Sequence, residues 1–359
     1  MPDTMPDTPS RTHPARPAGP VLLTGITGFI AKRIAADLLN AGYTVRGTLR
    51  TTSRADEVRA ALRPALREPD AADERLTFAE ADLTGDAGWD AAMAGAQALV
   101  HTASPFPLAQ PRDEAQLIRP AVDGTLRALR AAQSAGVTRV VLTSSVVAIL
   151  HNERPEGHVY TEEDWTETGH PTATPYARSK TLAERAAWAF AAEHPEMRLT
   201  AINPGLVAGR PLDARYGTSM QVVARFLSGK DPMVPNFGLA VVDVADVSAM
   251  HVAVLGRPET AGRRYIAAES FVMAPEMTGW LADAFPGRRI PTRVAPKWLL
   301  RGLALADPAV RAILPSIGDE KRLSNDCARQ ELGVTFTPAK DAVLASAAFL
   351  DETDRATAA

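Results

Sequence analysis

The chain has 359 residues, of which 46% are hydrophobic and 23% charged, and its formal net charge is −3. These values are ordinary for a globular protein, and the length allows a nucleotide-binding unit with a smaller second lobe. The charge gives no electrostatic reason to expect nucleic acid or an anionic membrane as a partner, and no apolar run approaches the roughly 18 to 20 residues of a membrane span.

The chain contains a single cysteine, Cys327. One cysteine excludes an internal disulfide and fits a reducing compartment, so we expect the protein to be cytoplasmic. Because no His/Cys cluster lies near Cys327, we expect no metal site.

Residues 1–19 differ in composition from the rest of the chain. Residues 1–4 repeat as residues 5–8, prolines recur, and apolar residues show no periodicity. Such a segment buries too little surface to offset its ordering entropy, so we expect a disordered tail. It lacks the hydrophobic stretch of a secretory signal.

From Pro20 onward, short apolar runs alternate with amphipathic stretches. Strands are predicted at 21–23, 43–49, 76–79, 98–100, 139–142 and 197–202, and helices at 29–40, at 113–134 and around Tyr176. This alternation predicts an α/β Rossmann fold, a doubly wound parallel sheet with helices on both faces. Ligands of such sheets bind outside the carboxyl ends of the strands.

The regular alternation is lost after residue 203. We therefore assign 20–203 and 239–268 to the nucleotide-binding Rossmann domain. A smaller, mostly helical substrate-binding lobe is predicted at 204–238 and 269–350, followed by a flexible C-terminus at 351–359.

A glycine-rich turn follows the first predicted strand and opens the first helix. Gly25 and Gly28 stand where the backbone turns sharply and approaches a pyrophosphate, and Ala31 is small enough for close packing of helix and strand. In this context the turn predicts a dinucleotide site.

The second predicted strand ends at Arg50, and Arg54 follows. A carboxylate here would accept a hydrogen bond from the ribose 2′-hydroxyl of NAD, whereas arginine suits the 2′-phosphate of NADP. No acid occurs before Asp56, so NADP(H) is favoured over NAD(H). The alternative is that both arginines are simply solvated.

Two further strand ends supply candidate cofactor contacts. Asp82, followed by Leu83, could hold the adenine amino group. The segment Thr102, Ala103 and Ser104 should run under the nicotinamide riboside, whereas the preceding His101 is expected to be a core histidine.

The catalytic candidates are Ser145, Tyr176 and Lys180. Tyr176 and Lys180 lie one helical turn apart on one face, where an ammonium can lower the pKa of a phenol that exchanges a proton with a carbonyl. Ser145 closes the fifth strand, where a hydroxyl can hydrogen-bond the substrate oxygen, although a serine there is more often a cap. Together with the glycine turn, the set predicts a nicotinamide-dependent carbonyl reductase.

Over residues 20–350 the sequence resembles the extended short-chain dehydrogenase/reductases, in the branch of dihydroflavonol reductase, cinnamoyl-CoA reductase and yeast-type aldehyde/ketone reductases. The matching stretches are 24–31, 45–50, 100–106, 120–126, 143–145, 176–184, 202–207 and 242–247.

The resemblance implies that Tyr176 donates the proton, that Lys180 holds the ribose hydroxyls and lowers the pKa of Tyr176, and that Ser145 polarises the carbonyl. It matches Arg50 and Arg54 to the positions that select NADPH, although plant members carry a lysine where this chain has Glu57. Further cofactor contacts are implied at Thr27, Phe29, Ile30, Pro204 and Val207.

Two other functions stay open on the same scaffold: a nucleotide-sugar epimerase or dehydratase with bound NAD, and a non-catalytic NADP-sensing protein. The sequence after Ser145 favours the reductases over the epimerases. Leu150 stands where plant flavonoid reductases have a polar asparagine. The composition of the loop at 149–175 and of the lobe after Gly205 predicts a mostly apolar pocket for a small carbonyl substrate. We expect a monomer or homodimer.

Overall fold

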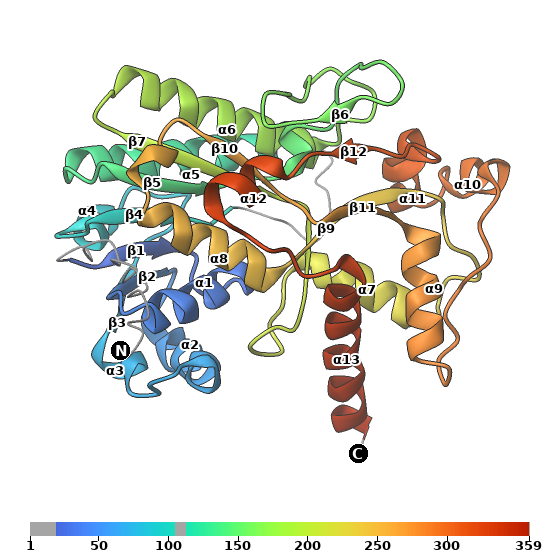
Figure 1. Ribbon diagram of the computed structural model, residues 1–359, viewed down its shortest axis with the longest axis horizontal. Coiled ribbons are helices and arrows are strands. Elements are labelled where there is room, and N and C mark those ends of the chain that lie inside the picture. The colour runs from blue at the N-terminus through green and yellow to red at the C-terminus, as the bar shows by residue number, and fades with distance from the viewer. Residues whose placement is uncertain (1–18, 105–112, 359) are drawn as a thin grey trace, which may run out of the picture.

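The computed structural model describes residues 19–104 and 113–358. The predicted tail at 1–19 therefore lies, except for Gly19, outside the described residues. Figure 1 shows a central sheet between two helical layers, with a second lobe built mainly from the C-terminal third of the chain.

The main sheet has seven strands in the order β10-β7-β5-β4-β1-β2-β3, and every neighbouring pair is parallel. The strands are β1 (Val21–Thr24), β2 (Val45–Leu49), β3 (Leu76–Glu80), β4 (Ala98–His101), β5 (Arg139–Thr143), β7 (Arg198–Pro204) and β10 (Arg264–Ala267). This order confirms the Rossmann fold. The direction of winding reverses between β1 and β4, so their carboxyl ends open the crevice in which such sheets bind ligands.

Helices cover both faces of this sheet (Figure 1). On one face α1 (Phe29–Asn40) packs against α8 (Val244–Leu255), and on the other α5 (Ala115–Ser134) packs against α6 (Pro175–Glu193). Successive strand residues point to opposite faces of the sheet. The side chains of Leu23 and Val100 pack in the core beneath α1 and α8, whereas those of Leu22 and Leu99 pack in the core beneath α5 and α6. The short helices at one end are α2 (Ala55–Leu62), α3 (Ala71–Glu74) and α4 (Trp89–Met93).

The C-terminal lobe contains two small sheets and six helices among the described residues. The sheets are β8 (Leu206–Ala208), β9 (Gly238–Asp243) and β11 (Ser270–Met273), and β6 (Val159–Tyr160) with β12 (Arg322–Leu323). The helices are α7 (Thr218–Leu227), α9 (Ala274–Ala284), α10 (Lys297–Leu303), α11 (Pro308–Ile313), α12 (Asp326–Leu332) and α13 (Ala339–Ala358). Helix α13 packs against α7 and α9 (Figure 1).

Two features differ from the boundaries that we expected. Within 239–268 only β10 returns to the main sheet, because β9 pairs with β8 and β11 instead. The expected flexible C-terminus at 351–359 instead continues α13 as far as Ala358. The helix continues because no glycine or proline follows Pro338, and Arg288 binds Asp351 and Asp354 at 2.8 and 2.9 Å between nitrogen and oxygen.

A buried ion pair ties the lobe to the first helix of the Rossmann domain. The Nζ atom of Lys32, on α1, is bonded to the carboxylate of Asp213 and donates to the carbonyl of Arg215 at 3.1 Å. Lys32 is only 2% exposed, and this burial lowers its pKa against the attraction of Asp213. The pair holds the segment after β8 against α1.

Across residues 19–104 and 113–358, no helix has both the length and the apolar character needed to cross a membrane. The same residues contain no group of three or more His, Cys, Asp or Glu side chains placed to hold a metal ion.

The junction between β7 and β8 requires a glycine. A Cβ atom at Gly205 would lie 2.3 Å from the carbonyl oxygen of Ala240. Gly205→Ala should therefore lower the free energy of unfolding by about 1 to 3 kcal/mol, as overpacking does, measured by denaturant unfolding.

Gly279→Ala in α9 is the matched control, because nothing lies within 4 Å of its added Cβ and alanine favours a helix. Equal losses in the two variants would contradict this account of Gly205.

Candidate active site

The local sequence places Tyr176 in the first turn of α6. Pro175 occupies the first helical position, and the Thr174 side chain accepts a hydrogen bond from the Ala177 amide at 3.2 Å, which caps the helix. Lys180 follows one turn later. The start of α6 is thus fixed independently of any ligand.

Ser145 directly follows the last residues of β5 and caps the 3-10 turn Val146–Ala148. Its Oγ accepts from the Val147 amide at 3.4 Å and donates to the Pro204 carbonyl at 3.3 Å. Ser145 also lies near enough to Tyr176 to lower the pKa of its phenol. The capping role and the contact with Tyr176 therefore coexist in one side chain.

Burial controls the acidity of the two helical residues. It raises the pKa of Tyr176 to about 12, against the hydrogen bond with Ser145, which lowers it. It lowers the pKa of Lys180 to about 8, against the charge of Glu184, which raises it. We expected the pKa of Tyr176 to be lowered by Lys180, and the structure shows the opposite direction because burial dominates.

The hydroxyl of Thr24 joins the ends of β1 and β4. Its Oγ1 accepts from the amides of Thr102 and Ala103, both at 3.1 Å, and lies 3.0 Å from Nδ1 of His101. Both lone pairs are thus used, so the Thr24 hydrogen must go to Nδ1, and the ring proton of His101 is on Nε2. Nε2 is buried and has no hydrogen-bond partner among the residues that the structure describes.

His101 is buried, as we expected of a core histidine. Burial, and secondarily the charge of Lys180, lowers its pKa to about 3. The imidazole is therefore neutral at physiological pH, and it does not compete with Lys180 for a proton.

The glycine turn forms a cradle that a side chain would fill. Gly25 has φ +67°, and a Cβ atom there would lie 3.0 Å from Cβ of Ala103. Gly28 precedes α1 without a side-chain cap, and the first turn of α1 carries no acid. The free amides and the helix dipole at this end suit a pyrophosphate, so the residues present fit a dinucleotide.

The neighbouring turn residues differ in what they can offer to such a ligand. Thr27 and Ile30 are half-buried, whereas Phe29 is buried in the core. Phe29 can therefore contact a ligand only through its backbone, whereas the side chains of Thr27 and Ile30 are accessible.

The two arginines predicted to select NADPH lie after β2, but Arg54 already has a partner. Its Nε and Nη2 donate to the carboxylate of Glu57 at 3.2 and 2.8 Å, and Arg215 approaches the same carboxylate at 3.1 Å. Arg50 is exposed. A phosphate here would compete with Glu57 for Arg54.

The carboxylate of Asp82 is already hydrogen-bonded within the turn that follows β3. Its Oδ1 accepts from the amide and the hydroxyl of Thr84, both at 2.8 Å, and these bonds lower its pKa. Leu83 packs on Gly124, where a Cβ atom would come within 2.9 Å of the leucine Cβ.

The remaining predicted contacts fall into two groups. Thr102 and Ala103 lie at the crevice through their bonds to Thr24, and Ser104 is the last described residue before 105–112. Pro204 is buried, and its carbonyl accepts a hydrogen bond from Ser145. Val207, on β8, is buried in the hydrophobic core and pairs with Val242 of β9.

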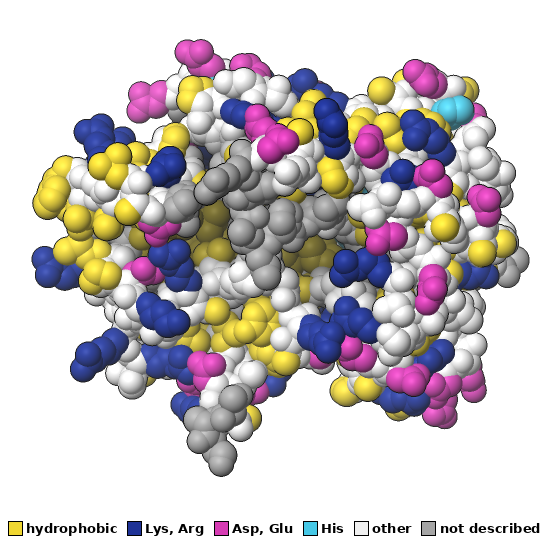
Figure 2. Space-filling model, turned by 180° about the vertical axis from the view of Figure 1, so that it is seen from behind, with side chains coloured by type: hydrophobic (Ala, Val, Ile, Leu, Met, Phe, Trp, Pro, Cys, Tyr) yellow, Lys and Arg dark blue, Asp and Glu magenta, His cyan; other side chains and the backbone are white. Residues whose placement is uncertain are grey.

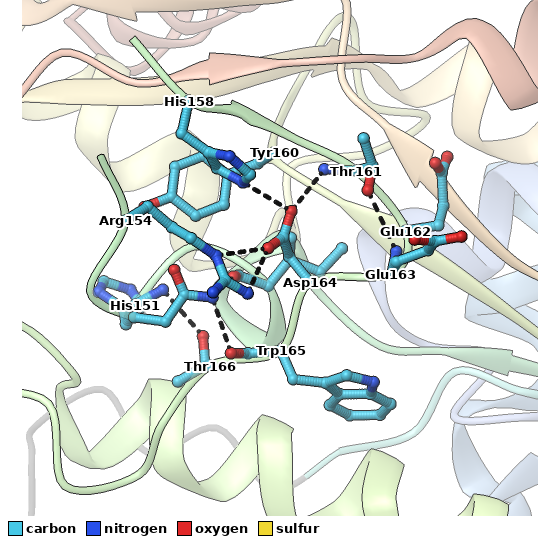
Figure 3. Close-up of polar contacts among 12 residues, drawn as sticks. His151, Arg154, His158, Tyr160, Thr161, Glu162, Glu163, Asp164, Trp165 and Thr166 are labelled. Carbon is cyan, nitrogen blue, oxygen red and sulfur yellow. Dashed lines mark hydrogen bonds and ion pairs between the residues drawn. The ribbon is translucent and has the colours of Figure 1, made fainter. Parts of the chain in front are cut away.

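The loop between Ser145 and Tyr176 folds around the carboxylate of Asp164 (Figure 3). Arg154 donates to Asp164 through Nε at 2.9 Å, His158 Nε2 lies at 3.0 Å, and the Thr161 amide donates at 3.0 Å. Trp165 belongs to the same loop (Figure 3), and the guanidinium of Arg185 on α6 lies 5.3 Å from the centre of its ring. The guanidinium of Arg264 stacks on the Trp165 ring, and its Cζ atom lies 3.8 Å from the centre of the ring.

Sequence reasoning missed several residues of this region, above all Thr24, Glu184 and Arg264. A signal existed for Glu184, which stands four residues after Lys180 and so on the same helical face. No sequence pattern marks Arg264, because it reaches α6 from a strand distant in sequence.

Figure 2 shows a hollow near the middle of one face, with hydrophobic side chains inside it and Lys and Arg side chains around it. A separate surface cavity of about 520 Å³ lies on the C-terminal lobe between α7 and α13, and its lining includes Tyr216, Arg225 and Arg288. That cavity contains none of the three catalytic candidates.

Comparison with known proteins gives a consistent result. The family model described as "NAD dependent epimerase/dehydratase family" matches residues 21–268. The chain is 37% identical to cinnamoyl-CoA reductase 1 of Arabidopsis thaliana, over 78% of this chain and 79% of that protein. It is 32% identical to dihydroflavonol 4-reductase of Zea mays, over 77% of each chain.

Among solved structures, yeast methylglyoxal/isovaleraldehyde reductase Gre2 complexed with NADPH superimposes with a TM-score of 0.77. The two are 25% identical, and the match covers 93% of this chain and 99% of the yeast protein.

The role of the Thr24 hydroxyl can be tested by an isosteric change. Thr24→Val leaves the amides of Thr102 and Ala103 and Nδ1 of His101 without their partner. We expect the free energy of unfolding to fall by about 1 to 3 kcal/mol, measured by denaturant unfolding. Thr24→Ser keeps the hydroxyl and should lose less than half as much; equal losses would show that only packing is involved.

Proposed function

This chain belongs to the NAD dependent epimerase/dehydratase family, and from that membership we propose that it is an NADPH-dependent reductase of an aldehyde or ketone. The observation that carries the proposal is that Ser145 lies beside Tyr176, with Lys180 one turn away, at the carboxyl end of a Rossmann sheet. The product is the corresponding alcohol, and the reaction is reversible.

Each residue of the set has a distinct role. Tyr176 gives its proton to the carbonyl oxygen, and its raised pKa keeps the phenol protonated at neutral pH. Ser145 hydrogen-bonds the same oxygen and stabilises the charge that develops on it. Lys180 holds the ribose hydroxyls. When bound, the nicotinamide supplies the hydride.

Two observations favour a reductase over the alternative, an epimerase or dehydratase. The relatives and the superimposed structure named above are reductases. In the sequence, Ser145 is followed by Val146 and Val147, and Asn203 by Pro204 and Gly205, as in the reductases that the chain resembles.

NADP(H) is the cofactor of this chain. The yeast reductase is a complex with NADPH, and here Arg50 and Arg54 follow β2 in place of the acid that NAD requires. The turn at Gly25 and the uncapped start of α1 would hold the pyrophosphate.

The substrate is a small molecule with an apolar body next to its carbonyl. Leu150 and Ile149 follow the Ser145 turn and are buried, with Tyr160 and Phe271 packed in the same cluster. A panel of aldehydes and ketones, with NADPH consumption followed by the nicotinamide absorbance, tests the assignment. Absence of NADPH oxidation with every carbonyl would contradict it.

Tyr176→Phe removes only the proton donor. Turnover should fall roughly 10²- to 10⁴-fold, the usual contribution of general acid catalysis, with NADPH affinity by fluorescence titration nearly unchanged. A variant that keeps near-wild-type kcat would show that Tyr176 is not the donor.

The 2′-phosphate proposal predicts a cofactor-specific effect. Each charged hydrogen bond contributes roughly 1.5 to 3 kcal/mol, so Arg50→Ala with Arg54→Ala should raise KM for NADPH at least tenfold and leave KM for NADH little changed. Glu57→Gln, which frees Arg54, should lower KM for NADPH.

Arg67→Ala is the control, since Arg67 is an exposed arginine of the same region. Equal, small effects of the double substitution on both cofactors would mean that the arginines are merely solvated.

A further inference from the structure

The carboxylate of Glu184 lies at the centre of a buried polar cluster, and the residue is 1% exposed. Its Oε2 accepts from Oγ of Ser144 at 2.5 Å and from Nδ2 of Asn203 at 2.8 Å. Its Oε1 accepts from Nε of Arg264 at 2.6 Å and from Nε1 of Trp188 at 3.2 Å. These four donors offset the cost of burying a carboxylate this deep in the protein.

The cluster is in direct contact with the proposed catalytic set. Tyr176, Lys180 and Glu184 follow one another at four-residue intervals, so they share one face of α6. Ser144 precedes Ser145 in the chain, and Nδ2 of Asn203 also donates to the backbone carbonyl of Ser145 at 3.2 Å. One carboxylate thus joins α6 to the ends of β5 and β7.

Glu184 is also a negative charge one helical turn from Lys180 on α6, and its ion-pair partner is Arg264. Of the elements packed against this helix, the 3-10 turn 146–148 carries only Val and Ala, and β7 carries one charged residue, the exposed Arg198. The charged residues of α5 are exposed except Arg127, which is bonded to Asp86. His101 of β4, whose pKa the charge of Lys180 also lowers, is neutral. Glu114, at the start of α5, is held by Arg178 at 2.9 Å, and Arg264 of β10 binds Glu184 itself.

We propose that Glu184 is a positioning residue of the reductase, which fixes the strand end that carries Ser145 and places a carboxylate one helical turn from Lys180. The inference rests on the proposed function, in which Lys180 acts as a cation. Glu184 itself does not touch the substrate or the cofactor; it acts through Ser144, Asn203 and Lys180.

The sign of the effect follows from the balance at Lys180. Burial lowers the pKa of Lys180 to about 8, and Glu184 opposes that fall. Without the carboxylate the pKa falls further, the more so because Arg264 is left as an unpaired neighbouring cation. Lys180 then loses its proton, and its function, at a lower pH than in the wild type.

The test is Glu184→Gln, with kcat/KM for NADPH and the NADPH dissociation constant measured from about pH 6 to about pH 10. The alkaline limb of both profiles should move down by about one pH unit, which makes the loss at alkaline pH roughly tenfold greater than the loss at pH 6. Glu184→Asp retains the charge and should restore the position of the limb, even at a reduced rate.

Glu193→Gln is the matched control, the same substitution at an exposed position of α6. It should leave the limb in place. A purely structural role of Glu184 predicts a lower melting temperature and the same fractional loss at every pH, and that result would overturn the proposal.

Should Glu184→Gln fail to fold, Arg264→Gln decides the question through the opposite sign. It removes a cation beside Lys180, so the limb should move to higher pH; a limb that moves down or stays would overturn the proposal. The wild-type measurements separate this inference from the proposed function. If the wild type neither binds nor oxidises NADPH, the proposed function fails. If the wild type turns over but the alkaline limbs of the variants do not move, only the role of Glu184 is refuted.

Discussion

The buried ion pair between Arg264 and Glu184 determines how three parts of this molecule meet. Besides Glu184, the Arg264 guanidinium donates to the carbonyls of Glu162 and Asp164 at 2.6 and 2.7 Å and stacks on Trp165. Removing one partner of a buried pair leaves an uncompensated charge, which costs about 3 to 5 kcal/mol. The edge strand β10, helix α6 and the loop drawn in Figure 3 are therefore held in one arrangement, and the start of α6 is held with them.

Burial sets the chemistry of the site as well as its shape. The same exclusion of water pushes the pKa of Tyr176 up and that of Lys180 down, so the phenol keeps its proton while the ammonium loses its own more easily. Nearby hydrogen bonds and charges only partly offset these shifts. The proposed acid and its cationic neighbour therefore differ in protonation behaviour because of the protein interior, and any ligand that fills the crevice adds to the same balance.

Much of the fold was predictable because its signals are local. The parallel strands, the glycine turn and the one-turn spacing of Tyr176 and Lys180 are all contained in short stretches, and the structure confirms the Rossmann fold. Contacts between distant segments were not predictable: nothing near Arg264 points to Glu184, and the apolar run of β9 does not reveal that it joins β8 and β11. The partner of Arg54 lies only three residues away, yet a pattern that pairs arginine with a phosphate does not predict that Glu57 will bind it first. The functional roles of Ser145, Tyr176 and Lys180 stay predictions.

The ion pair of Lys32 and Asp213 has a consequence for motion between the two halves of the protein. Lys32 is buried on the helix whose first turn would face the pyrophosphate, and Asp213 lies on the segment that follows β8 in the lobe. A rotation that moves this segment away from α1 separates the buried Lys32 ammonium from the Asp213 carboxylate, and breaking such a pair costs several kcal/mol. Domain opening in this chain must therefore carry the Asp213 segment along with α1, so the hinge lies beyond it, on the lobe side.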